Sequence, residues 1–273
     1  MKENPHERAL CDAVMAFHAD RKGQSIQFYA RPEALDRRMP SVDDLFTSPT
    51  GLIAIEHTRI ESFSGQIQDD KRLIDLLAPL QKDLSGQLPT PGTYYLYVLA
   101  NRVNFARGDY KKIRDAIVVW AKQKAPKLQL GSPSTAPNHL IREVPAGVPF
   151  ECTLAWKPGK EKFYVARFPP PDLEAQRVHR IAGALDRKLP KLFTTKSSCG
   201  GMSVLILESN DIALSNSSAI GKAFLQAIVS RMGWISDVVY LLETEMKPWY
   251  VTVLKEGDCL FPHIDNGGPS PLQ

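Results

Sequence analysis

Apolar and polar residues recur along this chain with two different periods, and these periods predict a mixed α/β protein. Apolar residues at helical spacing predict helices at residues 5–20, 66–84, 110–124, 173–189 and 219–232. Runs rich in β-branched, aromatic or aliphatic residues predict strands at residues 25–31, 41–46, 51–58, 93–100, 150–156, 162–168, 203–208, 237–243 and 249–254. Because helices and strands interleave from one end to the other, we expect a mixed sheet flanked by helices.

Proline frequency suggests how the chain is divided. Residues 126–149 contain five prolines with scattered Gly and Ser, a composition typical of a connection. We therefore predict a first domain at residues 1–125, a connection at residues 126–149, and a C-terminal α/β extension or second domain at residues 150–273. No role follows from the sequence for this last region.

Two strands around a short turn form the most informative stretch of the sequence. Residues 41–46 and 51–58 flank a turn that contains Pro and Gly, so they predict a hairpin. A turn centred midway between them places Asp43 opposite Glu56, with their Cβ atoms about 5 Å apart on one face. A slip of one residue would instead bring Asp44 opposite Glu56.

Two carboxylates that face each other point to a divalent cation. Like charges at this separation destabilise a hairpin unless something offsets their repulsion, and hard cations such as Mg²⁺ bind carboxylate oxygens. Side chains alternate along a strand, so Thr58 lies on the face of Glu56, whereas His57 points away and is more readily structural. The alternative is that Asp43 and Asp44 merely flank a surface turn and that Glu56 is an exposed strand residue.

The first predicted helix contributes another acid, because Glu7 falls on the apolar stripe formed by Leu10, Val14 and Phe17. A carboxylate on a buried stripe is costly unless it is paired or binds a cation. Near a helix start it can also interact with the helix dipole or remain in solvent, so both interpretations stay open.

The order of these elements resembles a known family. Helix, strand, acid-bearing strand, turn, strand ending in Glu-x-Lys, helix and strand form the core of the PD-(D/E)XK nuclease-like superfamily, and residues 5–101 resemble a divergent member of it. The resemblance rests on Val42-Asp43 and on Glu56-His57-Thr58. It implies a restriction-endonuclease-like fold, Asp43 and Glu56 as metal ligands, and Glu7 as the acid of the first helix.

The sequence departs from this family at Thr58, which stands where the family has a lysine. A threonine can hydrogen-bond a water molecule but cannot stabilise negative charge as an ammonium does. Members of the family sometimes draw the lysine from elsewhere, and Lys71 at the start of the next helix is the nearest candidate. A lysine there can also be merely solvated, so catalysis either uses a substitute or is lost.

These observations favour three functions in a definite order. The first is a hydrolase, an endo- or exodeoxyribonuclease that uses Mg²⁺ or Mn²⁺ to cleave the phosphodiester bonds of DNA. The second is a catalytically inactive protein that keeps the scaffold to bind nucleic acid or another protein, which Thr58 favours. The third is an α/β enzyme with its chemistry near Glu208 or Glu243, although strand ends are also simply where polar loops begin.

Charge adds one expectation about the partner. The net charge of +4 decides little, but residues 101–127 contain eight Lys and Arg, Arg102 among them, against two Asp. Within the predicted helix at residues 110–124, we expect Lys111, Lys112 and Arg114 to contact a nucleic-acid backbone, unless this basic face is only solvated.

Cysteine spacing and the lack of long apolar runs bear on metal binding, disulfides and cellular location. The four cysteines lie far apart without a C-x-x-C pair, so neither a zinc knuckle nor a disulfide framework is indicated. Charges recur through the first twenty residues, and no segment approaches the roughly twenty apolar residues that span a bilayer. We therefore expect a cytoplasmic protein that does not use a membrane, whose oligomeric state the sequence leaves open.

Overall fold

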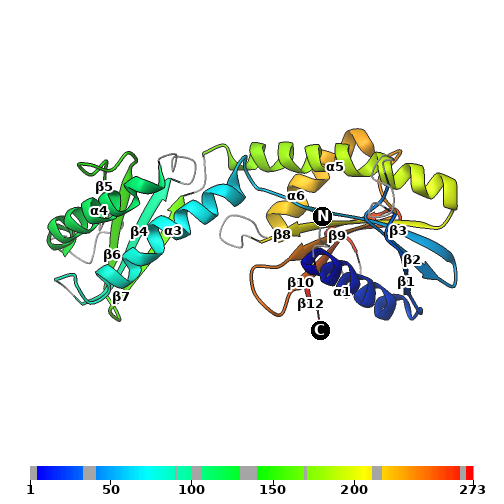
Figure 1. Ribbon diagram of the computed structural model, residues 1–273, viewed down its shortest axis with the longest axis horizontal. Helices are drawn as coiled ribbons and strands as arrows, with labels where there is room; N and C mark the ends of the chain where they lie inside the picture. Colours follow the sequence, from blue (N-terminus) through cyan, green and yellow to red (C-terminus); the bar gives the residue numbers. More distant parts are fainter. Residues whose placement is uncertain are drawn as a thin grey trace. The chain divides into compact units, whose positions relative to one another are not determined.

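The computed structural model divides the chain into two compact units (Figure 1). It describes residues 5–32, 41–89, 91–99, 106–129, 140–168, 171–210, 217–264 and 269–272. Unit 1 comprises Met1–Ser64 and Glu174–Gln273, and unit 2 comprises Gly65–Leu173, so unit 2 is inserted into unit 1. The divisions at residues 64 and 173 differ from the predicted ones near 125 and 150, because the inserted segment closes a hydrophobic core of its own.

Unit 1 is built on one mixed sheet. Its elements are α1 (Pro5–Lys22), β1 (Gln27–Ala30), β2 (Asp44–Ser48), β3 (Gly51–Arg59), α5 (Leu173–Cys199), β8 (Met202–Ser209), α6 (Ser217–Ile228), η3 (Val229–Arg231), β9 (Val238–Glu243), β10 (Tyr250–Glu256), β11 (Cys259–Leu260) and β12 (Ser270–Pro271). The strand order is β1-β2-β3-β8-β9-β10-β11, and β12 also pairs with β10. Strands β3, β8 and β9 are parallel, and the other neighbours are antiparallel.

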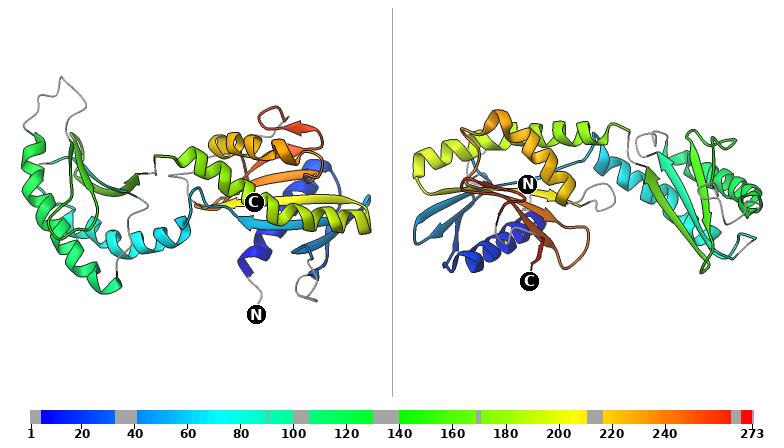
Figure 2. Two further views of the ribbon diagram at one scale, coloured as in Figure 1. Left: turned by 90° about the horizontal axis from the view of Figure 1, so that it is seen from above. Right: turned by 180° about the vertical axis from the view of Figure 1, so that it is seen from behind.

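Helices cover both faces of this sheet. Helix α1 lies on one face and helices α5 and α6 lie on the other, as Figure 1 and the view from behind in Figure 2 show. Strand β3 contributes to both cores, because Ile53 and Ile55 pack on the α1 side while Ala54 packs on the α5 side. This alternation decides on which face each polar side chain of β3 lies.

Unit 2 is a smaller α/β unit with a four-stranded sheet. Its elements are α3 (Gln66–Leu84), β4 (Thr93–Leu99), η1 (Arg107–Asp109), α4 (Tyr110–Lys124), η2 (Ala125–Gln129), β5 (Leu140–Glu143), β6 (Cys152–Lys157) and β7 (Lys162–Phe168). The strand order is β5-β6-β4-β7, with β4 parallel to β7 and antiparallel to β6. Helices α3 and α4 pack on the same face, where Leu80, Leu96 and Ile117 are buried together.

The predicted α/β class with mixed sheets and flanking helices is confirmed. The resemblance over residues 5–101 implies that the helix at 66–84 and the strand at 93–100 complete the sheet of the hairpin, and this is wrong. Both form as predicted, but they belong to unit 2, and α5 and β8 take their place beside β3. Two helix–strand pairs follow the hairpin with similar apolar patterns, and periodicity does not decide which of them pairs with it.

The Pro-rich segment at residues 126–149 is part of unit 2. Strand β5 lies within it and pairs with β6, while residues 130–139 fall outside the described residues. Across the described part of the chain, no helix is both long enough and apolar enough to cross a membrane.

Candidate active site

The hairpin of β2 and β3 has the register predicted from its turn. Leu45 pairs with Ala54, and Asp44 pairs with Ile55, so the alternative in which Asp44 faces Glu56 is wrong. Asp43 directly precedes β2, and its Oδ2 accepts a hydrogen bond of 2.7 Å from the backbone N–H that follows Glu56. Asp43 therefore lies beside Glu56 at the open end of the hairpin.

Both acids are buried on the α5 face of the sheet, where they meet lysines of α5. Glu56 is 0% exposed and Asp43 is 6% exposed. Lys188 Nζ lies 3.1 Å from Asp43 Oδ2 and is in closer contact with Glu56 Oε2. One turn further along, Lys191 Nζ lies 3.5 Å from Glu56 Oε1. Since one ammonium contacts both carboxylates, the two acids converge closely enough to share a cation.

Burial dominates the electrostatics of this group. It raises the pKa of Glu56, as does the charge of Asp43, to about 8, although Lys188 and Lys191 oppose the shift. Burial lowers the pKa of Lys188, but the negative charges of Glu56 and Asp43 outweigh it, so this pKa lies above its ordinary value. Lys188 therefore stays charged at neutral pH. The Glu56 carboxylate takes up a proton as the pH falls through about 8.

The lysine that contacts the two acids comes neither from position 58, where the family has its lysine, nor from Lys71. Thr58 is half-buried in β3 on the face of Glu56, as predicted, and has no ammonium to offer. Lys71 is exposed on α3 and belongs to unit 2. Lys188, and not Lys71, is the lysine that contacts both carboxylates.

The sequence holds a signal for Lys188 that the prediction missed. Ile181, Leu185 and Leu192 recur at helical spacing on the buried side of α5, and Lys188 falls on the same stripe. A lysine on an apolar stripe is rarely buried without a charged partner. The helix that carries it also precedes the very apolar strand β8, which pairs with β3.

Glu7 is not brought to the α5 face. Helix α1 packs on the opposite side of the sheet, so Glu7 Oε1 lies 3.9 Å from Nδ1 of His57, whose side chain points to the same side. A hydrogen bond from His57 is the largest influence on Glu7 and lowers its pKa. The acid that the family resemblance assigns to the site is thus a neighbour of His57.

His57 is held by a second buried acid behind the site. Its Nε2 lies 3.1 Å from Oε2 of Glu208, which is 1% exposed and also accepts hydrogen bonds from Arg59 and Thr244. Burial opposes the charged form of His57, but Glu208 and Glu7 raise its pKa to about 9. The same donors bring the pKa of Glu208 well below its ordinary value despite burial. Glu208 lies near the end of β8, inside the strand predicted at residues 203–208, and its side chain is buried and paired instead of belonging to a polar loop.

Two carboxylates are the oxygen donors that this group offers. Among the described residues, no group of three or more His, Cys, Asp or Glu could hold a metal ion. Asp43 and Glu56 offer two carboxylates, and Mg²⁺ commonly binds through one or two carboxylates together with water and substrate phosphate. Asp43 and Glu56 are thus donors of the kind that Mg²⁺ takes, and in the structure the Lys188 ammonium contacts both of them.

The basic helix expected to contact nucleic acid is α4 of unit 2. Lys111 and Lys112 are exposed on it, whereas Arg114 is half-buried and donates a hydrogen bond of 3.2 Å to the carbonyl oxygen of Asp75. Arg102, from the same basic cluster, lies outside the described residues. Two lysines of the expected contact surface are therefore available to a partner, and Arg114 also fixes α4 to α3.

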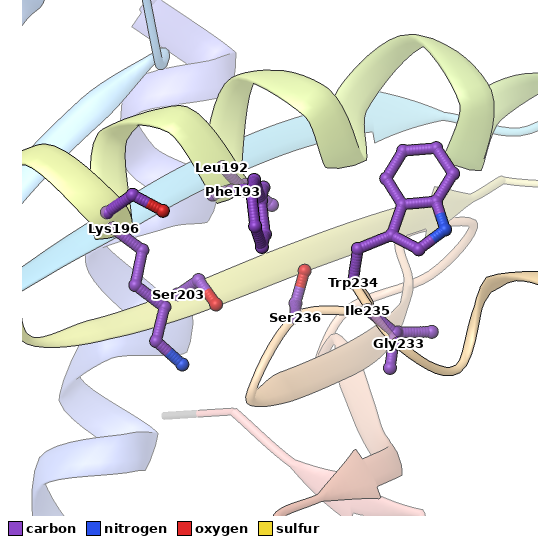
Figure 3. Close-up of a pocket in the computed structure, with 9 residues that line it drawn as sticks. Leu192, Phe193, Lys196, Ser203, Gly233, Trp234, Ile235 and Ser236 are labelled. Atoms are coloured by element: carbon purple, nitrogen blue, oxygen red, sulfur yellow. The ribbon is translucent and has the colours of Figure 1, made fainter.

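A hollow of about 240 Å³ lies further along α5, between this helix, the start of β8 and the segment before β9 (Figure 3). Lys196 and Trp234 line it at opposite ends in this view. Its polar groups bind each other, since Lys196 Nζ lies 2.6 Å from Asp237 Oδ1 and Ser203 donates two hydrogen bonds to Asp237 Oδ2. The hollow therefore adds no group to the Asp43 and Glu56 site.

Comparisons of this chain with protein-family models, with curated proteins and with solved structures each find no match.

Proposed function

We propose that unit 1 is a Mg²⁺-dependent nuclease that hydrolyses phosphodiester bonds of DNA, with Asp43 and Glu56 as metal ligands and Lys188 as the lysine of the site. The observation that carries this proposal is the Lys188 ammonium, which contacts both buried carboxylates of the hairpin. An acid pair with an adjacent lysine is the residue set that the family resemblance implies, with the lysine supplied by a helix in place of Thr58.

The order of elements in unit 1 supports a restriction-endonuclease-like fold. Read without the insertion, the chain runs α1, β1, β2, β3, α5 and β8, with three antiparallel strands followed by a helix and a strand parallel to β3. The same order of helix, three strands, helix and strand is what the resemblance to the PD-(D/E)XK core implies, and this agreement supports the proposal. Unit 2 is then an insertion between β3 and the helix that carries Lys188.

Each residue of the site has a distinct proposed role. When bound, Mg²⁺ lowers the pKa of a coordinated water and neutralises charge on the phosphate. Asp43 and Glu56 would hold the ion, and Lys188 keeps a fixed positive charge beside them because both acids raise its pKa. Thr58 lies on the same face of β3, where its hydroxyl can orient a water by hydrogen bonding.

One observation favours a second function, a catalytically inactive protein that binds nucleic acid or another protein. Lys188 and Lys191 already contact Glu56, and a buried acid paired with two lysines can be purely structural. In that case, the lysines occupy the position of the cation and the scaffold binds its partner without chemistry.

A DNA-cleavage assay separates the two functions. Supercoiled plasmid and linear duplex are incubated with the protein in Mg²⁺, in Mn²⁺ and in EDTA, and wild type is compared with Asp43→Ala, Glu56→Ala and, as a control at an exposed acid, Asp258→Ala. We expect cleavage that needs the metal, survives Asp258→Ala and falls by at least about a hundredfold in the two site variants. Cleavage unaffected by Asp43→Ala and Glu56→Ala would remove the proposed site, and DNA binding without cleavage would support the inactive scaffold.

The proposed partner is DNA, and a cytoplasmic location belongs to the same proposal. Lys111, Lys112 and Arg114 on α4 remain the proposed contacts to its phosphate backbone, because two of them are exposed and such contacts need no base-specific geometry.

A further inference from the structure

Unit 2 exposes a face of its sheet that its helices do not cover. Tyr94, Leu96 and Val98 of β4 point into the core beneath α3 and α4. Alternation along the strand therefore turns Tyr95 and Tyr97 to the opposite face, where both are half-buried. Among the described residues, helices α3 and α4 thus pack on the core face of this sheet, and the aromatic face lies on the other side.

Three tyrosines form a continuous stack on this face. The rings of Tyr95 and Tyr97 are 6.0 Å apart and nearly parallel, with an interplanar angle of 11°. Tyr164 of β7 pairs with Tyr95 across the ladder, and their rings are 5.5 Å apart at 22°. Tyr164 is 37% exposed, so the stack presents ring surface to solvent at this end.

Lysines accompany the stack. Lys157 Nζ lies 5.7 Å from the ring centroid of Tyr95, and Lys162 Nζ lies 5.9 Å from that of Tyr164. Both lysines pair with Thr93, one from each side, so they lie together at one end of the sheet. The described side chains that β4, β6 and β7 place on this face include no carboxylate, so the positive charge is not neutralised within those strands.

Aromatic rings beside lysines on an open sheet suit single-stranded nucleic acid. Bases stack on such rings while the lysines meet the phosphates, whereas in a duplex the base faces are hidden. We propose that the face formed by Tyr95, Tyr97, Tyr164, Lys157 and Lys162, the tyrosine face, binds single-stranded DNA. The choice of DNA over RNA rests on the proposed function of unit 1, but the stacking argument does not.

The tyrosine face is separate from the basic surface that the sequence indicates. Helix α4, which carries Lys111 and Lys112, packs on the core side of the sheet, and the tyrosines point away from that side. The two surfaces can therefore be distinguished by substitution. Binding through α4 depends on Lys111 and Lys112, whereas binding through the tyrosine face depends on Tyr164.

The test is fluorescence anisotropy with the full chain and short labelled oligothymidine in EDTA, so that cleavage plays no part. Wild type is compared with Tyr164→Ala, with Tyr164→Phe, which keeps the ring, and with Tyr29→Ala, a control at a 62% exposed tyrosine on a strand of unit 1. We expect Tyr164→Ala to weaken binding about tenfold, and Tyr164→Phe and Tyr29→Ala to bind like wild type. Thermal unfolding of each variant verifies that unit 2 remains folded.

A second variant tests the lysines. Lys157→Gln with Lys162→Gln should weaken binding and reduce the dependence of affinity on salt, because two phosphate contacts are lost.

Equal affinity of folded Tyr164→Ala and wild type would overturn the proposal. Equal binding of duplex and single strands, or no binding of oligothymidine by wild type, would also overturn it. Stronger binding of oligouridine than of oligothymidine would overturn the choice of DNA. Loss of cleavage in Asp43→Ala with retained oligothymidine binding would leave the proposal intact, so the two proposals fail separately.

Discussion

Glu56 is a carboxyl that the protein buries completely, and its surroundings explain why this is tolerated. Burial of an unpaired charge is costly, so such a group takes up a proton, pairs with a cation or binds a metal. Glu56 has the first two of these routes, because its pKa is raised to about 8 and Lys188 and Lys191 lie beside it. In the proposal a divalent ion supplies the third route, which is why Glu56 is central to it.

His57 supports the site from behind. Its backbone N–H holds the Asp43 carboxylate, and its side chain is fixed by Glu208 on the other face of the sheet. The sequence favours a structural role for His57 from strand alternation alone, and its position agrees with that interpretation. The contact between His57 and Glu208 could not be foreseen, because Glu208 lies about 150 residues further along the chain, on a strand whose pairing with β3 the local pattern does not indicate.

The charged form of His57 should stabilise the fold over a definite range of pH. Its pKa is raised from 6.5 to about 9, so this contribution is complete below pH 6.5 and is lost as the pH rises through 9. The shift corresponds to about 3 kcal/mol. We predict that His57→Asn lowers the free energy of unfolding by about that amount at neutral pH and by much less above pH 9.

Chemical denaturation of wild type and variant at the two pH values measures this difference. His179→Asn, at an exposed histidine of α5, is the matched control and should unfold like wild type at both. A cost of His57→Asn that does not change between neutral pH and pH 10 would show that the ion pair with Glu208 is not its source.

At the scale of elements, local pattern predicts the hairpin but not its partners. The turn and the strand alternation were sufficient to place Leu45 opposite Ala54 and to separate Thr58 from His57. The identity of the neighbouring helix depends on pairing between β3 and β8, which are separated by the whole of unit 2. Periodicity carries no information about such a long-range pairing, so the prediction took the next helix along the chain.

The helix that supplies the lysine can be tested directly. We predict that Lys188→Ala reduces metal-dependent DNA cleavage by about a hundredfold or more, because it removes the positive charge beside both acids. Lys71→Ala changes an exposed lysine of α3 and should leave cleavage unchanged. Single-turnover rates at saturating Mg²⁺ make the comparison, and a larger loss in Lys71→Ala than in Lys188→Ala would return the role to α3.

At the scale of the molecule, the chain holds two units with separate hydrophobic cores. The core of unit 2 is drawn from its own helices and strands, and the two cores of unit 1 combine the N-terminal hairpin with elements beyond residue 173. The sequence predicts two regions but divides them near the prolines, because composition marks irregular segments and not the borders of a core. The borders of the insertion, at residues 64 and 173, carry no such mark.

Because the two units have separate hydrophobic cores, we predict that a destabilising core substitution in one unit leaves the stability of the other unchanged. Leu96→Ala removes a fully buried side chain of β4 and should cost unit 2 about 2 to 5 kcal/mol. Hydrogen exchange should then rise in α3, β4 and β6 while β3 and β8 keep their protection. Leu205→Ala in β8 is the matched variant, with the opposite distribution expected. Equal loosening of both units by either variant would contradict their independence.

The central claim is that Asp43 and Glu56 together hold one divalent ion, and titration of Mn²⁺ followed by electron paramagnetic resonance tests it most directly. We predict one site in wild type, weakened at least about tenfold by Glu56→Gln and unchanged by Glu245→Gln at an exposed acid. Because a proton competes for Glu56 below about pH 8, affinity should rise with pH up to that value and then level off. Absence of Mn²⁺ binding above pH 8, or binding that Glu56→Gln leaves unchanged, would contradict the account.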